Sequence, residues 1–335
     1  MKTIREDAGP PATISRRRLM KLAGAGTLLT SFGRARAQGE WPQRPLRLVV
    51  PVAPGGVYDA QARLVAERLS ASLGQQVIVE NKPGAESRLG TAAVANAAPD
   101  GYTLLMCGSS MVHGVIFSRD VQYKLSQLTP LGMCSWLPIG FGINASLPAG
   151  NLKEFVSLSR ERPGSLAYGS IAISTRGIGE TFKRAAGIDL THVAYKGEAP
   201  LTTDLIAGHV HSGFMTSGGF KQWYGNAGKI KWLAVTTGKR MTRFPDVPTF
   251  VESGYPQMDL AAWLGFAVTG GTPREVVQRL SAKIGEVMTS PDVVAKILDL
   301  GVEPNYMPPD RFAGFIDEEL VRWRRIQKEA NLEVS

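Results

Sequence analysis

The residues with the clearest chemical potential form one segment, Pro51-Val52-Ala53-Pro54-Gly55-Gly56-Val57-Tyr58-Asp59. The segment follows the short apolar run 46–50 and precedes an amphipathic stretch, so it connects a predicted strand to a predicted helix. Its two adjacent glycines let the backbone turn so that successive N–H groups point the same way, above the positive end of the helix dipole. Such a loop suits a carboxylate, and the alternative is an ordinary tight turn between a strand and a helix.

Catalytic and metal-binding motifs are not found elsewhere in the sequence. No G-x-S-x-G elbow, phosphate-binding P-loop or G-x-G-x-x-G motif opens a predicted helix. His209 and His211 share one face of a predicted strand, but no third Cys, Asp or Glu stands at ligand spacing. We therefore expect no metal, no cofactor and no enzymatic activity, and interpret the two histidines as strand-surface residues.

The sequence has two cysteines, Cys107 and Cys134. In an oxidising compartment they could form a disulfide, but a domain of this size does not need one to be stable. We expect two buried free thiols, and the disulfide is the alternative.

Most of the positive charge lies at the N-terminus. Residues 1–37 hold eight Lys or Arg against two acidic residues, so the other residues of this 335-residue chain carry only +3 of its net charge of +9. A body so close to neutral, without a stripe of Lys and Arg, argues against nucleic-acid binding.

The basic N-terminus has the order of a twin-arginine export signal. Arg16-Arg17-Arg18 precedes a weakly apolar run over 22–32, and Ala35-Arg36-Ala37 supplies a small-x-small cleavage site. The run is much shorter than the ~20 residues needed to cross a bilayer. We expect cleavage after Ala37 and a periplasmic mature protein.

Predicted strands and helices alternate through the rest of the chain, which is typical of doubly wound α/β sheets. The predicted strands are 46–50, 77–79, 102–106, 166–168, 191–195, 210–214 and 230–236, and the predicted helices are 59–73, 89–97, 152–160, 179–186, 201–207, 272–288, 290–300 and 310–330. The middle of the chain has enough strands for a sheet of its own, so we expect two lobes, with crossings near Phe141–Ala145 and Ala261–Phe266. In such folds the ligand binds at the carboxyl ends of the strands.

Five motifs occur in the order found in one protein family. The loop at 51–59 is followed by VENKPGA at 79–85, APDGYTLL at 98–105, YKGEAP at 195–200 and FPDVPT at 244–249. From about Trp41 to Leu332 the chain resembles the Bug-type substrate-binding proteins, which are the extracytoplasmic receptors of tripartite tricarboxylate transporters.

The resemblance implies an α/β fold of two lobes, the Venus-flytrap arrangement of type II-like periplasmic binding proteins. We expect a signal peptide at 1–37, lobe 1 at 38–142 and 263–335, and lobe 2 at 143–262. It also implies a monomeric receptor that captures a small carboxylate, either aromatic or dicarboxylic, and delivers it to the permease subunits of a tripartite tricarboxylate transporter. The alternatives are a signalling receptor that presents its ligand to a sensor ectodomain, and a twin-arginine-exported enzyme.

The resemblance also assigns ligand-binding residues to positions in this sequence. They are Pro54, Gly55, Gly56, Tyr58 and Asp59 in the first loop, Ser109 and Ser110 after the strand at 102–106, and Ser174, Thr175, Thr216 and Ser217 in the second lobe. Lys196 lies in a matching motif and either shapes a turn or touches the ligand.

Several positions depart from the family pattern where specificity would be set. Val57 and Tyr58 are larger than the usual small residues and could stack on an aromatic or apolar ligand. Glu86-Ser87 replaces a Gly pair, and Met215 stands where an acidic residue is common. Arg176 adds a positive charge. The loss of an acid and the gain of Arg176 favour an anion over an amino acid as the ligand.

Overall fold

The computed structural model describes residues 40–216 and 228–333. Residues Arg44–Ser335 form one compact unit, apart from Met1–Gln43. The expected export signal and Ser217 therefore lie outside the described residues. Within the described ranges, no helix combines the length and the apolar character required to span a membrane.

The first sheet has six strands in the order β11-β4-β10-β3-β1-β2. Its strands are β1 (Leu46–Val50), β2 (Val77–Asn81), β3 (Thr103–Gly108), β4 (Leu128–Leu137), β10 (Ala262–Thr269) and β11 (Glu303–Met307). β1 runs parallel to both β2 and β3, whereas β10 runs antiparallel to β3 and β4. This sheet is therefore mixed, with the parallel pairs at one end.

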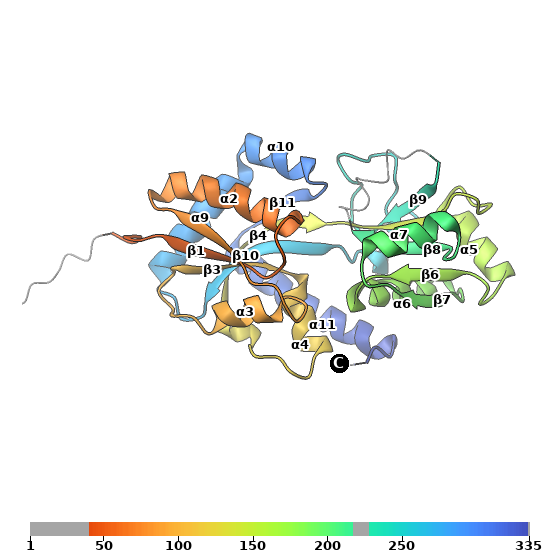
Figure 1. Cartoon of the computed structure of the whole chain (residues 1–335), viewed down its shortest axis with the longest axis horizontal. Helices are drawn as coiled ribbons and strands as arrows, with labels where there is room; N and C mark the ends of the chain where they lie inside the picture. The colour runs from red at the N-terminus through yellow and green to blue at the C-terminus, as the bar shows by residue number, and fades with distance from the viewer. Residues whose placement is uncertain (1–39, 217–227, 334–335) are drawn as a thin grey trace, which may run out of the picture. The chain divides into compact units, whose positions relative to one another are not determined.

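Helices cover both faces of this sheet (Figure 1). One face carries α2 (Val57–Leu73), α9 (Arg274–Thr289) and α10 (Pro291–Asp299), and the other carries α3 (Arg88–Ala95), α4 (Ser109–Phe117) and α11 (Pro309–Glu329). A 3-10 turn, η1 (Leu125–Gln127), precedes β4.

The second sheet has five strands in the order β7-β6-β8-β5-β9. Its strands are β5 (Ile139–Asn144), β6 (Ala167–Ser170), β7 (Thr191–Ala194), β8 (Ser212–Thr216) and β9 (Ile230–Val235), and its helices are α5 (Leu152–Glu161), α6 (Ile173–Ala186) and α7 (Glu198–Ala207). α5 and α6 contribute Phe155 and Phe182 to one hydrophobic cluster, and α7 contributes Leu201 and Leu205 to another. The helices again lie on both faces.

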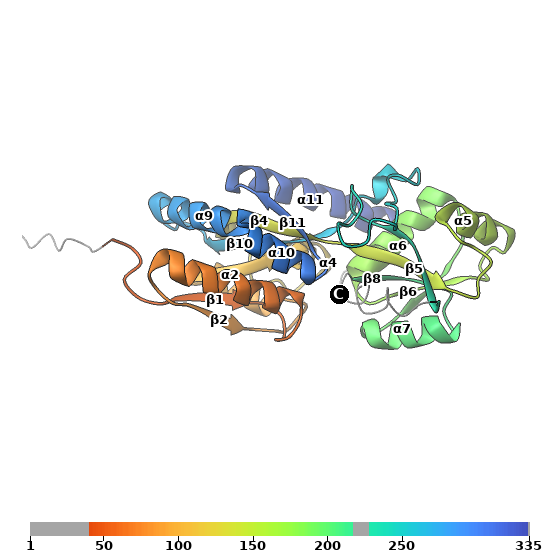
Figure 2. The same ribbon diagram turned by 90° about the horizontal axis from the view of Figure 1, so that it is seen from above.

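The chain passes from the first sheet to the second at Pro138, between β4 and β5 (Figure 2). It returns between β9 and β10, through a segment that includes the turn η2 (Pro256–Met258). The expected boundary between residues 142 and 143 falls inside β5, which pairs with β8 and β9 in the second sheet. The expected crossing at Phe141–Ala145 is therefore corrected to Pro138.

Several observed elements were not among the predicted ones. β4, β11 and α4 were not predicted, β5 and β10 were expected only as crossing segments, and β4 shows why a strand was missed. It contains Pro130 and Gly132, residues that usually interrupt strands, and it tolerates them because its register with β10 shifts next to each of them. Cys107 and Cys134 are both buried and free, which confirms the expectation of two thiols.

Aromatic rings fill the core of the second sheet around Phe141. Its ring centroid lies 4.8 Å from that of Phe214, 5.2 Å from that of Phe155 and 5.4 Å from that of Phe182. Close packing continues at Gly179 in α6, where an added Cβ would lie 2.2 Å from the buried ring of Tyr168. The missing side chain of Gly179 is what lets α6 approach β6.

Gly179→Ala is therefore expected to destabilise the protein by about 1–3 kcal/mol, although alanine normally favours a helix interior by about 1 kcal/mol. The matched control is Gly314→Ala in α11, where an added Cβ meets nothing within 4 Å and should be neutral or stabilising. Urea unfolding of both variants measures the difference. Equal effects of the two substitutions would contradict this account of the packing.

Candidate functional site

The predicted ligand-binding residues gather at two strand edges. β1 and β3 are parallel neighbours, so their carboxyl ends lie at one edge of the first sheet, where α2 and α4 begin. β6 runs parallel to both β7 and β8, so the carboxyl ends of these three strands share an edge of the second sheet. α6 and α7 begin at this second edge.

The carboxylate of Asp59 holds the first loop in its shape. Its Oδ2 accepts hydrogen bonds from the Gly55 N–H at 3.0 Å and from Arg63 Nε at 3.0 Å, and its Oδ1 accepts one from Asn81 Nδ2 at 2.9 Å. The Asp59 side chain is buried. The hydrogen bond from Arg63 does most to lower the pKa of Asp59 to about 2, against the opposing effect of burial.

Asn81 extends the same network to β2. Its Nδ2 also donates to the Val52 carbonyl at 3.1 Å, and its Oδ1 accepts from Arg63 at 3.1 Å. The asparagine of the VENKPGA motif therefore fixes the preceding loop from the neighbouring strand. Apart from the motif itself, no feature of the sequence indicated this role.

The first loop leaves several backbone donors free. Gly55 has a φ of +94°, in the left-handed region that favours glycine, and its N–H is already bonded to Asp59. The N–H groups of Gly56, Val57 and Tyr58 begin α2, and no hydrogen bond is recorded for them within the described residues. Pro54, Gly55 and Gly56 are exposed. The loop thus presents unpaired donors to solvent at a positive helix end.

The Tyr58 side chain packs downward onto β3. A Cβ at Gly108 would lie 2.1 Å from the Tyr58 hydroxyl, so Gly108 has to be a glycine. Burial raises the pKa of Tyr58 to about 12. The hydroxyl end of the ring is thus held against β3, whereas Tyr58 as a whole is half-buried, and stacking of its ring on an aromatic ligand stays a prediction.

Ser109 and Ser110 open α4 beside Tyr58. Ser109 Oγ accepts a hydrogen bond from the Trp263 N–H at 2.9 Å and so ties α4 to the start of β10. Ser110 Oγ is buried without a hydrogen-bond partner in the described structure. It lies close enough to the Tyr58 hydroxyl to lower that group's pKa slightly, against the larger effect of burial.

In the second lobe, Ser174 and Thr175 lie in the first turn of α6. Thr175 Oγ1 accepts from the N–H groups of Ile171 and Ala172, at 3.1 and 3.0 Å, and donates to the Ala172 carbonyl. Its hydroxyl therefore shapes the loop, in the same way that Asp59 does in the first lobe. The N–H groups of Ile173 and Ser174 have no recorded hydrogen bond in the described part of the chain.

Thr216 ends β8, and its N–H donates to Glu198 Oε1 at 2.6 Å. Glu198 is the first residue of α7, so a carboxylate reaches this edge from a different loop. Glu198 thus supplies a carboxylate near the position where Met215 replaces the family's usual acidic residue. This weakens the sequence-based argument against an amino-acid ligand.

Ser170 and His192, which the sequence analysis did not single out, also lie at this edge. Ser170 Oγ lies 2.8 Å from His192 Nε2, and burial is the main cause that lowers the pKa of His192. The positive charge of Arg176 lowers it further, so this guanidinium lies near the pair. Arg176 Nε is buried and makes no hydrogen bond to the described residues.

Metal binding finds no support in the described ranges, where no group of three His, Cys, Asp or Glu side chains is placed to hold an ion. His209 lies beside Asp204, and His211 Nδ1 accepts from the Ala167 N–H at 3.0 Å. Both histidines precede β8 rather than lying in it.

Comparison with known proteins identifies a family that this chain matches. Residues 61–332 match the model of the tripartite tricarboxylate transporter family receptor.

Three solved structures are similar over most of the chain. A structure of Rhodopseudomonas palustris Rpa4515 with adipate is 32% identical, with a TM-score of 0.75, and the match covers 88% of this chain and 99% of that one. The periplasmic binding protein BugD is 30% identical, with a TM-score of 0.71 and coverage of 88% and 99%. MatC from Rhodopseudomonas palustris with bound malate is 28% identical, with a TM-score of 0.69 and coverage of 85% and 99%.

Asp59→Asn tests the network of the first loop. The amide places a donor where Gly55 and Arg63 also donate, so we expect a loss of about 1–2 kcal/mol at pH 7. The folded-state pKa lies below the unfolded value near 3.9, so the carboxylate stabilises the fold above about pH 4 and this stabilisation is lost as the pH falls toward 2. Unfolding free energies of wild type and variant should therefore converge at low pH.

Glu286→Gln is the control, because it removes an exposed ion pair with Lys283 and should cost less than about 0.5 kcal/mol. A difference between wild type and Asp59→Asn that stays constant down to pH 2 would refute the role of the charged carboxylate.

Proposed function

The chain belongs to the tripartite tricarboxylate transporter receptor family, and from this membership we propose that it captures a small dicarboxylate and delivers it to a tripartite tricarboxylate-type transporter. Members of this Bug-type family are solute-binding receptors, and the chain has their two-lobed α/β fold. We assign lobe 1 to residues 44–137 and 262–335, and lobe 2 to residues 139–261. The binding cleft in this proposal lies between the two strand edges.

The observation that carries the proposal is the set of free N–H groups at the start of α2. Three successive donors at the end of a 17-residue helix, on a loop fixed by Asp59, suit one carboxylate group. These backbone donors contact only the carboxylate group. The remainder of the ligand therefore has to be recognised by other residues.

A second carboxylate is favoured by the chemistry of lobe 2. α6 begins with the free N–H groups of Ile173 and Ser174, and Arg176 adds a guanidinium within the same helix. Rpa4515 and MatC, the similar structures with ligands, hold adipate and malate.

These contacts are sufficient for a receptor. Micromolar binding requires about 8 kcal/mol. Each helix N-terminus contributes roughly 0.3–2 kcal/mol to an anion, and each charge-assisted hydrogen bond about 1.5–3 kcal/mol, partly offset by ordering and desolvation. All these contacts act together only when both lobes contact the ligand, so binding shifts the population toward closure.

The proposed place of action is the periplasm. The family is extracytoplasmic, and the sequence of residues 15–37 supports export by the twin-arginine route with cleavage after Ala37. N-terminal sequencing of the mature protein tests the cleavage site.

A thermal-shift series tests the ligand class. Adipate and malate should raise the melting temperature in proportion to RT ln(1 + [L]/Kd), and the monocarboxylates acetate and benzoate should raise it much less. Strong stabilisation by benzoate alone would contradict the dicarboxylate assignment. No stabilisation by any of the acids would contradict the receptor function itself.

Gly56→Pro tests the backbone donors directly. Gly56 has a φ of −87°, close to the value that proline imposes, so the fold should be retained while one donor is lost and the ring blocks its neighbours. We expect at least a hundredfold loss of affinity for the acid found above, equivalent to about 2.7 kcal/mol. Isothermal titration measures it, with Gly314→Ala as the control for an unrelated glycine.

Unchanged urea unfolding of Gly56→Pro shows that the variant is folded. A folded variant with wild-type affinity would exclude the helix N-terminus as the carboxylate site.

A further inference from the structure

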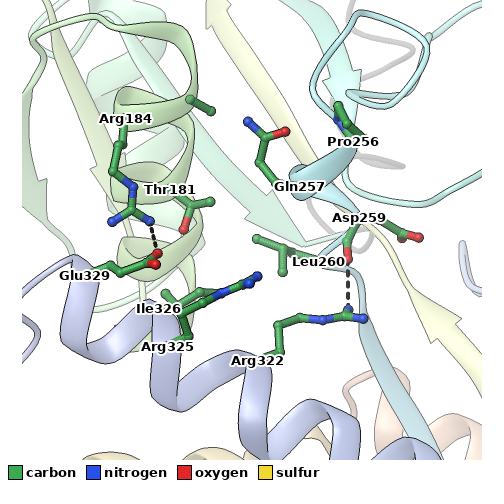
Figure 3. A pocket seen from close by; sticks show the side chains of 11 residues that line it. Thr181, Arg184, Pro256, Gln257, Asp259, Leu260, Arg322, Arg325, Ile326 and Glu329 are labelled. Atoms are coloured by element: carbon green, nitrogen blue, oxygen red, sulfur yellow. Dashed lines mark hydrogen bonds and ion pairs between the residues drawn. The ribbon is translucent and has the colours of Figure 1, made fainter.

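A cavity lies apart from the two strand edges, between α6, residues 256–260 and α11 (Figure 3). Its volume is about 530 Å³, within the range of small-molecule sites. None of the predicted ligand-binding residues lines it. Its walls come from helices that pack against different sheets, since α6 packs on β6 and α11 packs on β4.

Close packing of α6 on α11 forms one end of the cavity region. A Cβ at Gly177 would lie 3.0 Å from Trp323, 3.2 Å from Ile326 and 3.3 Å from Leu332. The two helices therefore contact each other directly, and the cavity opens where their side chains diverge toward Arg184 and Arg325.

The lining carries more positive than negative charge. The lining includes Arg184 of α6 and Arg322 and Arg325 of α11, together with the acidic residues Glu329 and Asp259. The Asp259 carboxylate points away from the cavity (Figure 3); burial raises its pKa, opposed first by the positive charge of Arg322 and then by the hydrogen bond from the Gly238 N–H. Glu329 is therefore the carboxylate that remains among the lining residues, and it pairs with Arg184.

The other two arginines differ in how far they are engaged. Arg322 donates to the Asp259 carbonyl at 3.1 Å and pairs with Glu319 at 3.1 Å. Arg325 has no recorded partner among the described residues, and its side chain extends over α11 toward Leu260 (Figure 3). At least one complete guanidinium fork is thus free at the cavity.

The remaining lining suits a compact, polar ligand. Leu260 and Ile326 provide apolar surface, and Gln257 adds an exposed amide. The Thr181 hydroxyl is already bonded to the Gly177 carbonyl at 2.8 Å. The unused donors belong to guanidinium and amide groups, and the planar guanidinium fork matches carboxylate and phosphate oxygens in pairs.

We propose that this cavity binds a small anion bearing carboxylate or phosphate groups, held by Arg325 and Arg184, at a site separate from the ligand cleft. The anion contacts Arg325 with both oxygens of one group and shares Arg184 with Glu329. Because Arg184 belongs to α6 and Arg325 to α11, a bound anion fixes the spacing of these two helices.

Isothermal titration of the mature protein with inorganic phosphate, and of mature Gly56→Pro with citrate because the wild-type cleft also binds carboxylates, tests the proposal at constant ionic strength set by sodium chloride. We expect saturable binding and at least a tenfold increase in Kd for Arg325→Gln, which corresponds to about 1.4 kcal/mol. Arg324→Gln is the matched control, because Arg324 is exposed on the same helix and does not line the cavity. Its Kd should stay within twofold of wild type.

The two probes separate the two chemistries, since citrate carries carboxylates and phosphate does not. Gly56→Pro should bind phosphate as wild type does, because its change lies in the first loop. Loss of phosphate binding in Gly56→Pro would place the anion in the cleft and overturn the second site. Equal effects of Arg324→Gln and Arg325→Gln, or no saturable binding, would also overturn it.

Discussion

The arrangement of the first lobe depends on one buried carboxylate. Asp59 accepts hydrogen bonds from the Gly55 N–H, from Arg63 and from Asn81, and so joins the loop after β1 to its own helix and to β2. A carboxylate accepts from several directions at once, and an ion pair with Arg63 keeps it charged. Because Asp59 satisfies Gly55, the next three N–H groups are left for an external anion.

In the second lobe a neutral side chain, that of Thr175, holds the corresponding loop. Thr175 Oγ1 accepts from two successive N–H groups of the loop before α6, which leaves the donors at the start of that helix free. In both lobes a residue three positions after the N-cap binds the loop, and the helix end faces outward. The polar side chains at these two positions organise the donors, whereas the backbone supplies them.

The sequence predicted the elements whose ends are marked by strong local signals. α2 ends at Gly74, whose φ is +68°, and α10 begins at Pro291, and both were expected. β4 was missed because Pro130 and Gly132 interrupt its pattern, and the register shifts that accommodate them depend on β10, more than 100 residues away. Non-local pairing of this kind leaves no mark in a short window of sequence.

The site was predicted as a set of positions, and the division of roles within it was not. Gly55 and Thr175 lie at the expected edges, but their donors or hydroxyls are used locally. The packing of Tyr58 on Gly108 depends on the close approach of α2 to β3, which spacing alone does not reveal. The hydrogen bond from the Thr216 N–H to Glu198 joins two different loops, and sequence spacing does not reveal it either.

The start of β10 is held more firmly than the rest of the crossing segments. Glu319 Oε2 accepts from the indole N–H groups of Trp263 and Trp323, each at 3.3 Å, and Ser109 Oγ accepts from the Trp263 N–H. Burial raises the pKa of Glu319, and Arg322 opposes this by pairing with it. Trp263 is thus anchored to both α11 and α4. A change in the angle between the lobes has to be absorbed before this anchor, at Pro138 and in the residues that precede β10, because bending there breaks none of these buried bonds.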